Sequence, residues 1–181
     1  IKGNQYAAVK EYEKSLKILE DIGDEKAISA SLNNIGNIYM NHGQYLKALG
    51  FYQKGLRLAK KSKDPVNISA NIINLGTVYL EQGNSKKAIE YANKALLISE
   101  KADDKAGLAA AYSMMANACK LDKNLKESLK YNQKSLEIQK KLNNNQGIAE
   151  CLIGIGKIYQ EQGKLSEALI MLNNGIATAT K

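Results

Sequence analysis

The chain has 181 residues and a formal net charge of +8 at pH 7, with 26 lysine and arginine residues against 18 aspartate and glutamate residues. It has one histidine and two cysteines, and no Cys/His cluster at metal-ligand spacing, P-loop or nucleophile motif, which argues against an enzyme and against a metal or other cofactor. No apolar run reaches the roughly 20 residues of a membrane span and no signal-peptide pattern opens the chain, so we expect a cytoplasmic protein without a membrane span.

Composition also bears on partners and compartment. Lysines recur in every second predicted helix with acidic residues between them, and we expect the tyrosines there on the apolar stripe rather than among the lysines. We interpret the charge as a solvated outer face and expect no nucleic-acid partner. Cys119 and Cys151 occupy non-equivalent positions and are predicted to be buried free thiols, as in a reducing compartment.

A pattern of small and aromatic residues returns every 40 residues. The recurring positions are Gly36, Gly76, Ala116 and Gly156; Tyr39, Tyr79, Cys119 and Tyr159; and Ala48, Ala88, Ser128 and Ala168. A fixed period of roughly 20–50 residues is typical of repeat proteins, in which neighbouring units share one core. We therefore predict a single array over 1–181, with a half repeat at 1–23 and full repeats at about 24–63, 64–103, 104–143 and 144–181. Because the chain begins at Ile1, partway into a repeat, we expect it to be a fragment of a longer protein.

Each repeat divides into two helical halves separated by turn residues. In the segment after Gly43, apolar residues fall on one helical stripe, and no strand pattern occurs. The predicted helices span 5–22, 25–41, 45–62, 65–81, 85–101, 105–121, 125–141, 145–161 and 165–180. Since short turns make neighbouring helices antiparallel, the predicted fold is all-α, with about nine helices in antiparallel pairs.

Helix starts and stops follow the same period. The predicted N-caps are Asp24, Asp64, Asp104 and Asn144, whose side chains can accept a hydrogen bond from an otherwise unpaired backbone N–H. Glycine recurs at Gly43, Gly83 and Gly163, where the first helix of a pair must end in a left-handed residue. Lys123 takes this place in the third full repeat, so we expect a less tight turn there, or a transfer of the left-handed role to Asn124.

These residues resemble the tetratricopeptide repeat (TPR) family. The first full copy of its pattern reads Leu32, Ile35, Gly36, Tyr39, Gly43, Ala48, Tyr52, Gly55 and Leu56. The repeat of 40 residues is similar to the lengthened repeats of kinesin light chains, spindle-orientation adaptors and bacterial regulatory proteins. The resemblance implies a right-handed α-α superhelix that binds proteins and catalyses nothing.

The resemblance also implies a concave groove lined by the first helix of each repeat. The partner-binding residues expected there are Asn33, Asn34, Asn37, Asn41, Asn74, Thr77, Asn117 and Lys157, with Met40, Leu80 and Met114 as apolar contacts beside them. An asparagine side chain offers both a donor and an acceptor, so a row of them can hold the backbone of an extended peptide whatever its side chains are. Asparagine makes up 18 of the 181 residues, so an incidental polar face is the alternative.

Two functions follow from this pattern. The first is a non-catalytic interaction module that binds a peptide segment of a partner protein in its groove. The alternative is a sensor or regulatory region of a larger bacterial signalling protein, a kinase or transcription regulator, acting through conformational change or dimerisation. Helix 165–180 carries a single charge where its equivalents carry several, so we also expect self-association through this helix.

Overall fold

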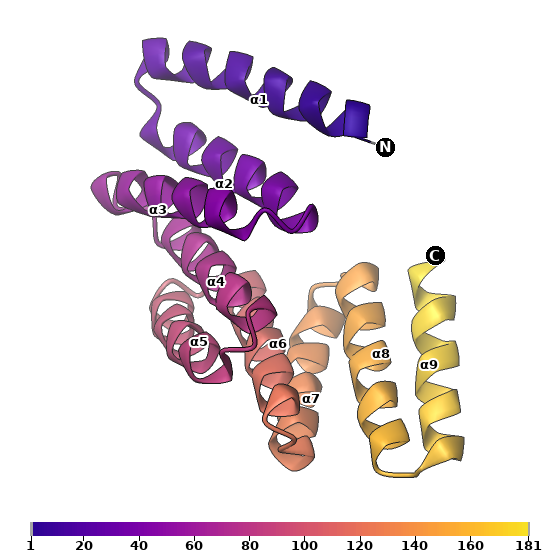
Figure 1. Cartoon of the computed structure of the whole chain (residues 1–181). Helices are drawn as coiled ribbons and strands as arrows, with labels where there is room; N and C mark the ends of the chain where they lie inside the picture. Colours follow the sequence, from indigo (N-terminus) through magenta and orange to yellow (C-terminus); the bar gives the residue numbers. More distant parts are fainter. Residues whose placement is uncertain (1, 181) are drawn as a thin grey trace.

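The computed structural model describes residues 2–180, with side chains from Val9 onward. Within these residues the chain forms nine α-helices and no strand (Figure 1). Their bounds are α1 Lys2–Ile22, α2 Glu25–Asn41, α3 Tyr45–Lys61, α4 Pro65–Glu81, α5 Ser85–Lys101, α6 Lys105–Leu121, α7 Leu125–Lys141, α8 Asn145–Glu161 and α9 Leu165–Ala179. The predicted helices are confirmed, although α1 begins earlier than expected. Positions 1 and 181, at the ends of the predicted array, lie outside the described residues.

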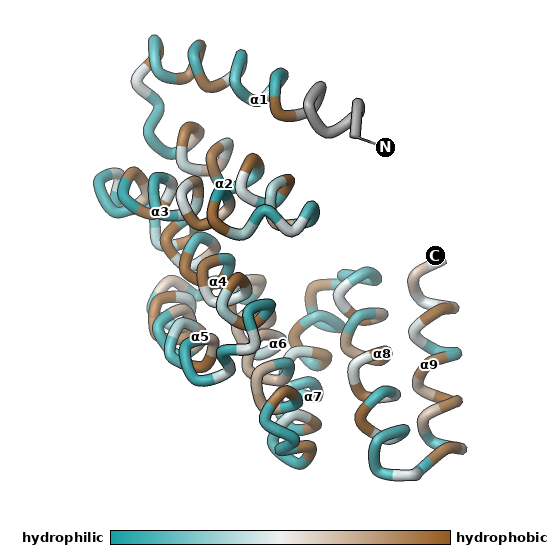
Figure 2. Tube along the Cα trace, viewed as in Figure 1, coloured by the Kyte–Doolittle hydropathy of each residue, from teal (hydrophilic) through white to brown (hydrophobic). Residues whose placement is uncertain are grey.

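Consecutive helices pack as antiparallel pairs, and the pairs stack into a solenoid. The pairs are α2 with α3, α4 with α5, α6 with α7, and α8 with α9, and α1 packs on α2. The second helix of each pair packs on the first helix of the next, and α4 also touches α2 and α6. We call α2, α4, α6 and α8 the inner helices and α3, α5, α7 and α9 the outer helices. Figure 2 shows hydrophobic and hydrophilic positions alternating around each helix, as expected for stacked amphipathic units.

The helix starts were predicted correctly because each has a local cause. The side chains of Asp24, Asp104 and Asn144 accept a hydrogen bond from the backbone N–H three residues on, at 3.0, 2.9 and 3.2 Å. Asp64 accepts from two backbone N–H groups, and Pro65 occupies the first position of α4, where a missing N–H costs nothing. Neither Asn84 nor Asn124 was predicted to be an N-cap, yet they cap α5 and α7 in the same way.

The expectation for the turn at Lys123 was wrong. Lys123 itself adopts the left-handed conformation, with φ of 58°, close to the 76° of Gly83 in the preceding repeat. The two hydrogen bonds that close this turn measure 2.9 Å each, against 2.9 and 2.8 Å at the Gly83 turn, so it is equally tight. Asn124 has φ of −83° and serves as a cap. Glycine is therefore preferred at this position rather than required, and lysine bears a strain on the order of 1–2 kcal/mol.

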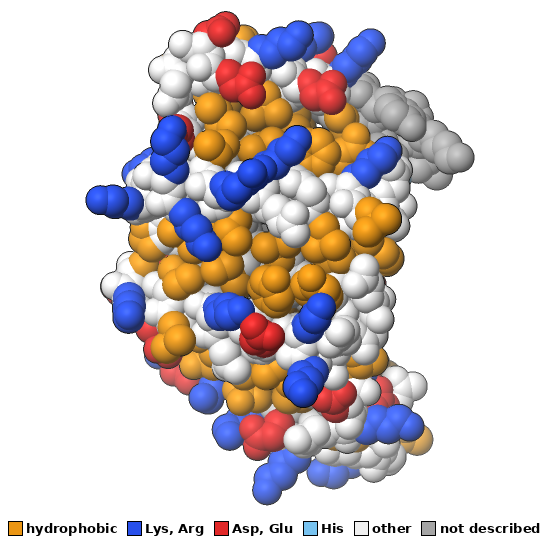
Figure 3. Space-filling view, turned by 60° about the vertical axis from the view of Figure 1, so that its left-hand side comes forward, with side chains coloured by type: hydrophobic (Ala, Val, Ile, Leu, Met, Phe, Trp, Pro, Cys, Tyr) orange, Lys and Arg blue, Asp and Glu red, His pale blue; other side chains and the backbone are white. Residues whose placement is uncertain are grey.

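Lysine side chains of the array lie over half-buried aromatic rings. The distances from ammonium nitrogen to ring centroid are 5.1 Å for Lys47 on Tyr39, 4.5 Å for Lys87 on Tyr79, 5.8 Å for Lys54 on Phe51 and 5.3 Å for Lys94 on Tyr91. Of the outer-helix tyrosines, Tyr52 and Tyr91 lie on the apolar stripe as expected. A lysine nevertheless also lies over Tyr91, because a half-buried ring packs one side into the core and leaves a face for a cation. Figure 3 shows lysine and arginine side chains spread between hydrophobic side chains on one face of the molecule.

The two cysteines are buried and free, as predicted. Burial raises the pKa of both thiols, because the charged thiolate would lose its hydration. Cys151 lies 3.4 Å from the hydroxyl of Ser135, within the core between α7 and α8. Among the described residues no helix is long and apolar enough to cross a membrane.

Glycines inside the inner helices mark places where helices approach closely. Next to Gly36, the ring of Tyr52 occupies the space that a Cβ would need. A Cβ at Gly76 would lie 2.6 Å from the sulfur of Met114 and 2.8 Å from the Cβ of Tyr91. The helices therefore approach closely at these glycines, and the packing offsets the low helix propensity of glycine.

We predict that Gly76→Ala lowers the free energy of unfolding by about 1–3 kcal/mol, because the added methyl group overpacks this contact. Gly50 is the matched control, since it lies within a helix and has open space where an added Cβ would stand. Gly50→Ala should raise stability by up to about 1 kcal/mol through helix propensity alone. Thermal unfolding followed by circular dichroism measures both, and a Gly76→Ala protein as stable as Gly50→Ala would contradict the packing argument.

Candidate functional site

The inner helices carry the eight residues expected to bind a partner, but the structure places them at different depths. Asn34, Asn41, Asn117 and Lys157 are exposed, and Asn37, Asn74 and Thr77 are half-buried. Asn33 is only 8% exposed. The eight residues therefore do not form one uniform row.

The asparagines of α2 and α4 form a hydrogen-bond network with each other. Nδ2 of Asn74 donates to Oδ1 of Asn33 at 2.9 Å and to Oδ1 of Asn37 at 3.1 Å. The hydroxyl of Tyr52 donates to the same oxygen of Asn37 at 2.8 Å. Burial raises the pKa of Tyr52 far above its usual value, so its hydroxyl remains a donor. The network joins two successive repeats.

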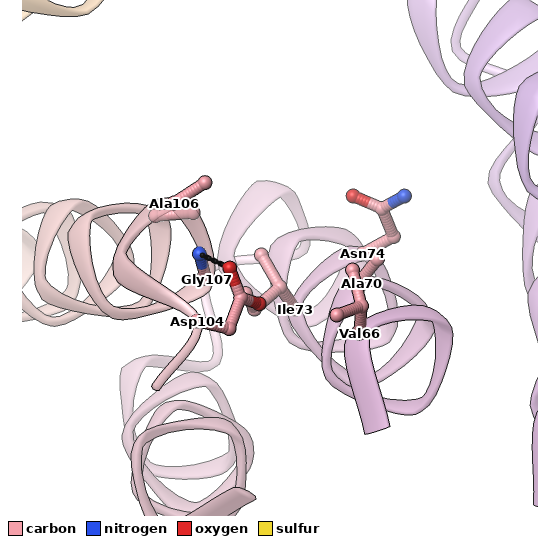
Figure 4. Close-up of a pocket in the computed structure, with 8 residues that line it drawn as sticks. Val66, Ala70, Ile73, Asn74, Asp104, Ala106 and Gly107 are labelled. Atoms are coloured by element: carbon pink, nitrogen blue, oxygen red, sulfur yellow. Dashed lines mark hydrogen bonds between the residues drawn. The ribbon is translucent and has the colours of Figure 1, made fainter. Parts of the chain in front are cut away.

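The side chain of Asn74 is consequently left with one polar atom that can bond a ligand. An asparagine amide has two hydrogens, and both hydrogens of Asn74 are used by Asn33 and Asn37. Its carbonyl oxygen has no hydrogen-bond partner within the part of the chain that the structure describes. In Figure 4 this oxygen lies on the side of α6, opposite the amide nitrogen. Asn74 can therefore accept a hydrogen bond from a ligand but cannot donate one without losing an internal bond.

Asn33 serves the network rather than the surface. Its Oδ1 accepts from Asn74 and, at 3.4 Å, from Asn37. Its Nδ2 is buried and has no partner among the described residues, which costs about 1–3 kcal/mol. A buried amide in this position fixes how α4 sits against α2.

The next contact between inner helices, the seam between α4 and α6, uses other side chains. Met114 stands 40 residues after Asn74 and is buried between α4 and α6, 3.9 Å from the hydroxyl of Thr77. The expectation that Met114 contacts a partner in the groove was therefore wrong. Asn34 holds the same repeat position in α2, and it is exposed because no inner helix precedes α2 within residues 2–180.

Two pockets open between the inner helices. The first, of about 260 Å³, lies between α4 and α6 (Figure 4). It is lined by Val66, Ala70, Ile73, Asn74, Asp104, Ala106, Gly107 and Ala110. Sequence reasoning missed most of these residues, because small and apolar residues in the first turns of a helix look like ordinary packing positions. Asp104 was interpreted only as a helix cap.

The second pocket, of about 420 Å³, contains two residues that the repeat pattern had placed in the groove, Leu80 and Asn117. It is lined by Leu80, Asn117, Lys120, Leu121, Lys123 and Glu161. The ammonium group of Lys120 lies 3.2 Å from the carboxylate of Glu161, so this ion pair links α6 to α8. An exposed amide thus stands beside apolar side chains and a partly exposed ion pair.

No group of three or more metal-binding side chains occurs within the described residues. His42 is exposed at the end of α2, where its Nδ1 lies 2.7 Å from the carbonyl oxygen of Ile38. The arrangement of the inner face is suited to non-covalent binding through amides, apolar walls and charges.

We predict opposite effects on stability for the two asparagines that occupy equivalent positions. Asn74→Ala removes two hydrogen bonds worth about 0.5–1.5 kcal/mol each and gains about 0.6 kcal/mol of helix propensity, so it should destabilise the protein. Asn34→Ala removes no internal bond and should raise the free energy of unfolding by about 0.6 kcal/mol. Denaturant unfolding measures both, and equal effects of the two replacements would show that the network contributes nothing.

Comparisons with known proteins agree with this architecture. A family model described as "Tetratricopeptide repeat" matches residues 27–101, 66–141 and 107–181. The crystal structure of BtubC (BKLC) from P. vanneervenii is 20% identical with a TM-score of 0.76, covering 96% of this chain and 71% of that chain. No protein of curated function matches the sequence.

Two Rap structures have the same fold. A Rap protein complexed with competence and sporulation factor is 19% identical with a TM-score of 0.86, covering 98% of this chain and 50% of that one. The Rap conjugation gene regulator of plasmid pLS20, in complex with the Phr* peptide, is 19% identical with a TM-score of 0.87, covering 99% and 50%. The chain therefore spans half the length of these Rap chains. At such identities the likeness concerns the fold.

Proposed function

Because the chain belongs to the tetratricopeptide repeat family, whose matches run from residue 27 to residue 181, we propose that it binds a peptide segment of a partner protein in the groove of its inner helices. The module holds an extended or partly helical segment and catalyses nothing. The observation that carries the proposal is the second pocket, where the exposed amide of Asn117 stands beside Leu80 and Leu121. Such a combination can bond a peptide backbone and cover an apolar side chain at once.

The predicted contact residues divide into two groups in this proposal. Asn34, Asn41, Asn117 and Lys157 contact the partner directly, since their side chains are exposed. Asn74 contributes its carbonyl oxygen. The remaining three, Asn33, Asn37 and Thr77, hold the inner helices in place, because their side chains contact side chains of the neighbouring inner helix.

Of the two Rap structures, the one in complex with the Phr* peptide supports a peptide as the partner. The Rap protein complexed with competence and sporulation factor and the Rap regulator in complex with the Phr* peptide each share the fold over nearly the whole of this chain. The second of these is also the observation that favours the alternative function, a regulatory region within a longer signalling protein. Both functions fit a cytoplasmic location, which the two buried free thiols support.

A peptide selection tests the proposal. Binding sequences are selected from a random peptide library with the wild-type protein, and their affinities are measured by calorimetry for the double variant Asn34→Ala/Asn117→Ala. We expect a loss of about 0.5–1.5 kcal/mol of binding free energy for each hydrogen bond removed. Asn93→Ala is the matched control, because Asn93 is an exposed amide in an outer helix. Selected peptides that bind the double variant as tightly as they bind the wild type and the Asn93→Ala control would overturn the proposal.

We further propose self-association through α9. Leu165, Leu169, Ile170 and Ile176 are exposed by 68%, 60%, 55% and 60%. Leu56 and Leu96 stand at the position of Ile176 in earlier repeats. Both pack against a core that the next inner helix completes. A second copy can cover the α9 surface in the same way, because exposed apolar patches of this kind favour association.

Light scattering over a range of protein concentrations checks this proposal, and we expect the mean mass to rise with concentration. Ile170→Lys should keep the protein monomeric, since Lys130 stands at the equivalent position of α7. Leu46→Lys is the control, because Leu46 is 82% exposed on α3, away from α9. A wild-type protein that stays monomeric at every concentration would contradict the proposal.

A further inference from the structure

The pocket between α4 and α6 contains a carboxylate oxygen without an internal partner. Asp104 caps α6 with Oδ1, which accepts from the N–H of Gly107 at 2.9 Å. Its Oδ2 has no hydrogen-bond partner among the described residues. The ion pairs found in those residues also do not include Asp104.

The equivalent aspartate one repeat earlier is satisfied within the protein. Asp64 uses Oδ1 for two backbone N–H groups, and its Oδ2 accepts from the side chain of Asn67 at 3.0 Å. Gly107 stands where α4 has Asn67, so α6 has no side chain that can reach Asp104 in this way. One repeat later the cap is Asn144, which has no charge. Asp24, the cap of α2, also uses only Oδ1 among the described residues, but it is exposed and lines neither of the pockets between the inner helices.

The rest of the pocket offers apolar walls and one more acceptor. Val66, Ala70, Ile73, Ala106 and Ala110 line it, and three of these are alanines, which leaves space of about 260 Å³. The other polar side chain is Asn74, whose amide hydrogens are already used and whose oxygen lies toward α6 (Figure 4). The side chains of the pocket thus present two acceptors, one of them charged.

We propose that this pocket binds a lysine or arginine side chain of the partner segment. The aliphatic part of that side chain lies against the apolar walls, and its charged end donates to Oδ2 of Asp104 and Oδ1 of Asn74. An apolar side chain would cover the carboxylate without satisfying it, and an acidic one would be repelled by it. The inference rests on the proposed peptide groove and adds to it a requirement for one basic residue in the partner.

The test uses capped pentapeptides, acetyl-Ala-Ala-Xaa-Ala-Ala-amide, in which Xaa is arginine, lysine, citrulline or norleucine. Citrulline keeps the shape of arginine without its charge, and norleucine keeps the stem of lysine. Each is titrated into isotope-labelled protein, with the Gly107 backbone amide and the Asn74 side-chain amide followed by NMR. We expect the arginine and lysine peptides to shift these signals at concentrations at least tenfold lower than the neutral peptides do.

Asp104→Asn removes the charge and keeps the cap, as Asn144 does in the next repeat. This variant should keep its thermal midpoint and lose the preference for basic peptides. Asp64→Asn is the matched control and should retain the preference, because both oxygens of Asp64 are bonded within the protein. Equal affinities for arginine and citrulline peptides, or an undiminished preference in Asp104→Asn, would overturn the inference. In either case, shifts at Asn117 with any of the peptides would leave the proposed groove standing.

Discussion

The close approach of helices at a few small residues is the constraint on which the array depends. At Gly36 the ring of Tyr52 fills the place of a side chain, and at Gly76 the same is true of Met114 and Tyr91. Because contacts so short leave no freedom in helix spacing, each outer helix has a fixed position on its inner helix. Repetition of this contact every 40 residues then sets the spacing of the inner helices. The groove and both of its pockets are consequences of that spacing.

Polar groups within the seams determine which side chains remain free for a partner. Asn74 lies across the seam between α2 and α4 with its donors engaged. Met114 closes the next seam and leaves Asn117 exposed. An array built from nearly identical units therefore presents a different chemical surface in each repeat. Which partner such a protein binds can therefore depend on which repeat carries an unsatisfied polar group, rather than on the fold.

Much of the fold could be predicted because its causes are local. A cap such as Asp24 and a turn glycine such as Gly43 act within a few residues of their own position, so a period in the sequence reveals them. The turn at Lys123 was misjudged because tertiary packing overrides a conformational preference of about 1–2 kcal/mol. The site was harder to predict, since Asn33, Asn74 and Asn117 look alike in sequence. Their burial depends on whether a neighbouring helix covers them, which a repeat pattern does not reveal.

The lysines that lie over aromatic rings also tie the hydrophobicity of the surface to the charge state of individual side chains. Lys87 covers Tyr79 and Lys94 covers Tyr91, and these two rings stack with centroids 5.4 Å apart. Methylation of such a lysine keeps the positive charge and therefore the attraction to the ring, whereas acetylation removes it. An acetylated array would leave the stacked rings of Tyr79 and Tyr91 without the cations that lie over them. The same chain would then expose aromatic surface where it had carried positive charges.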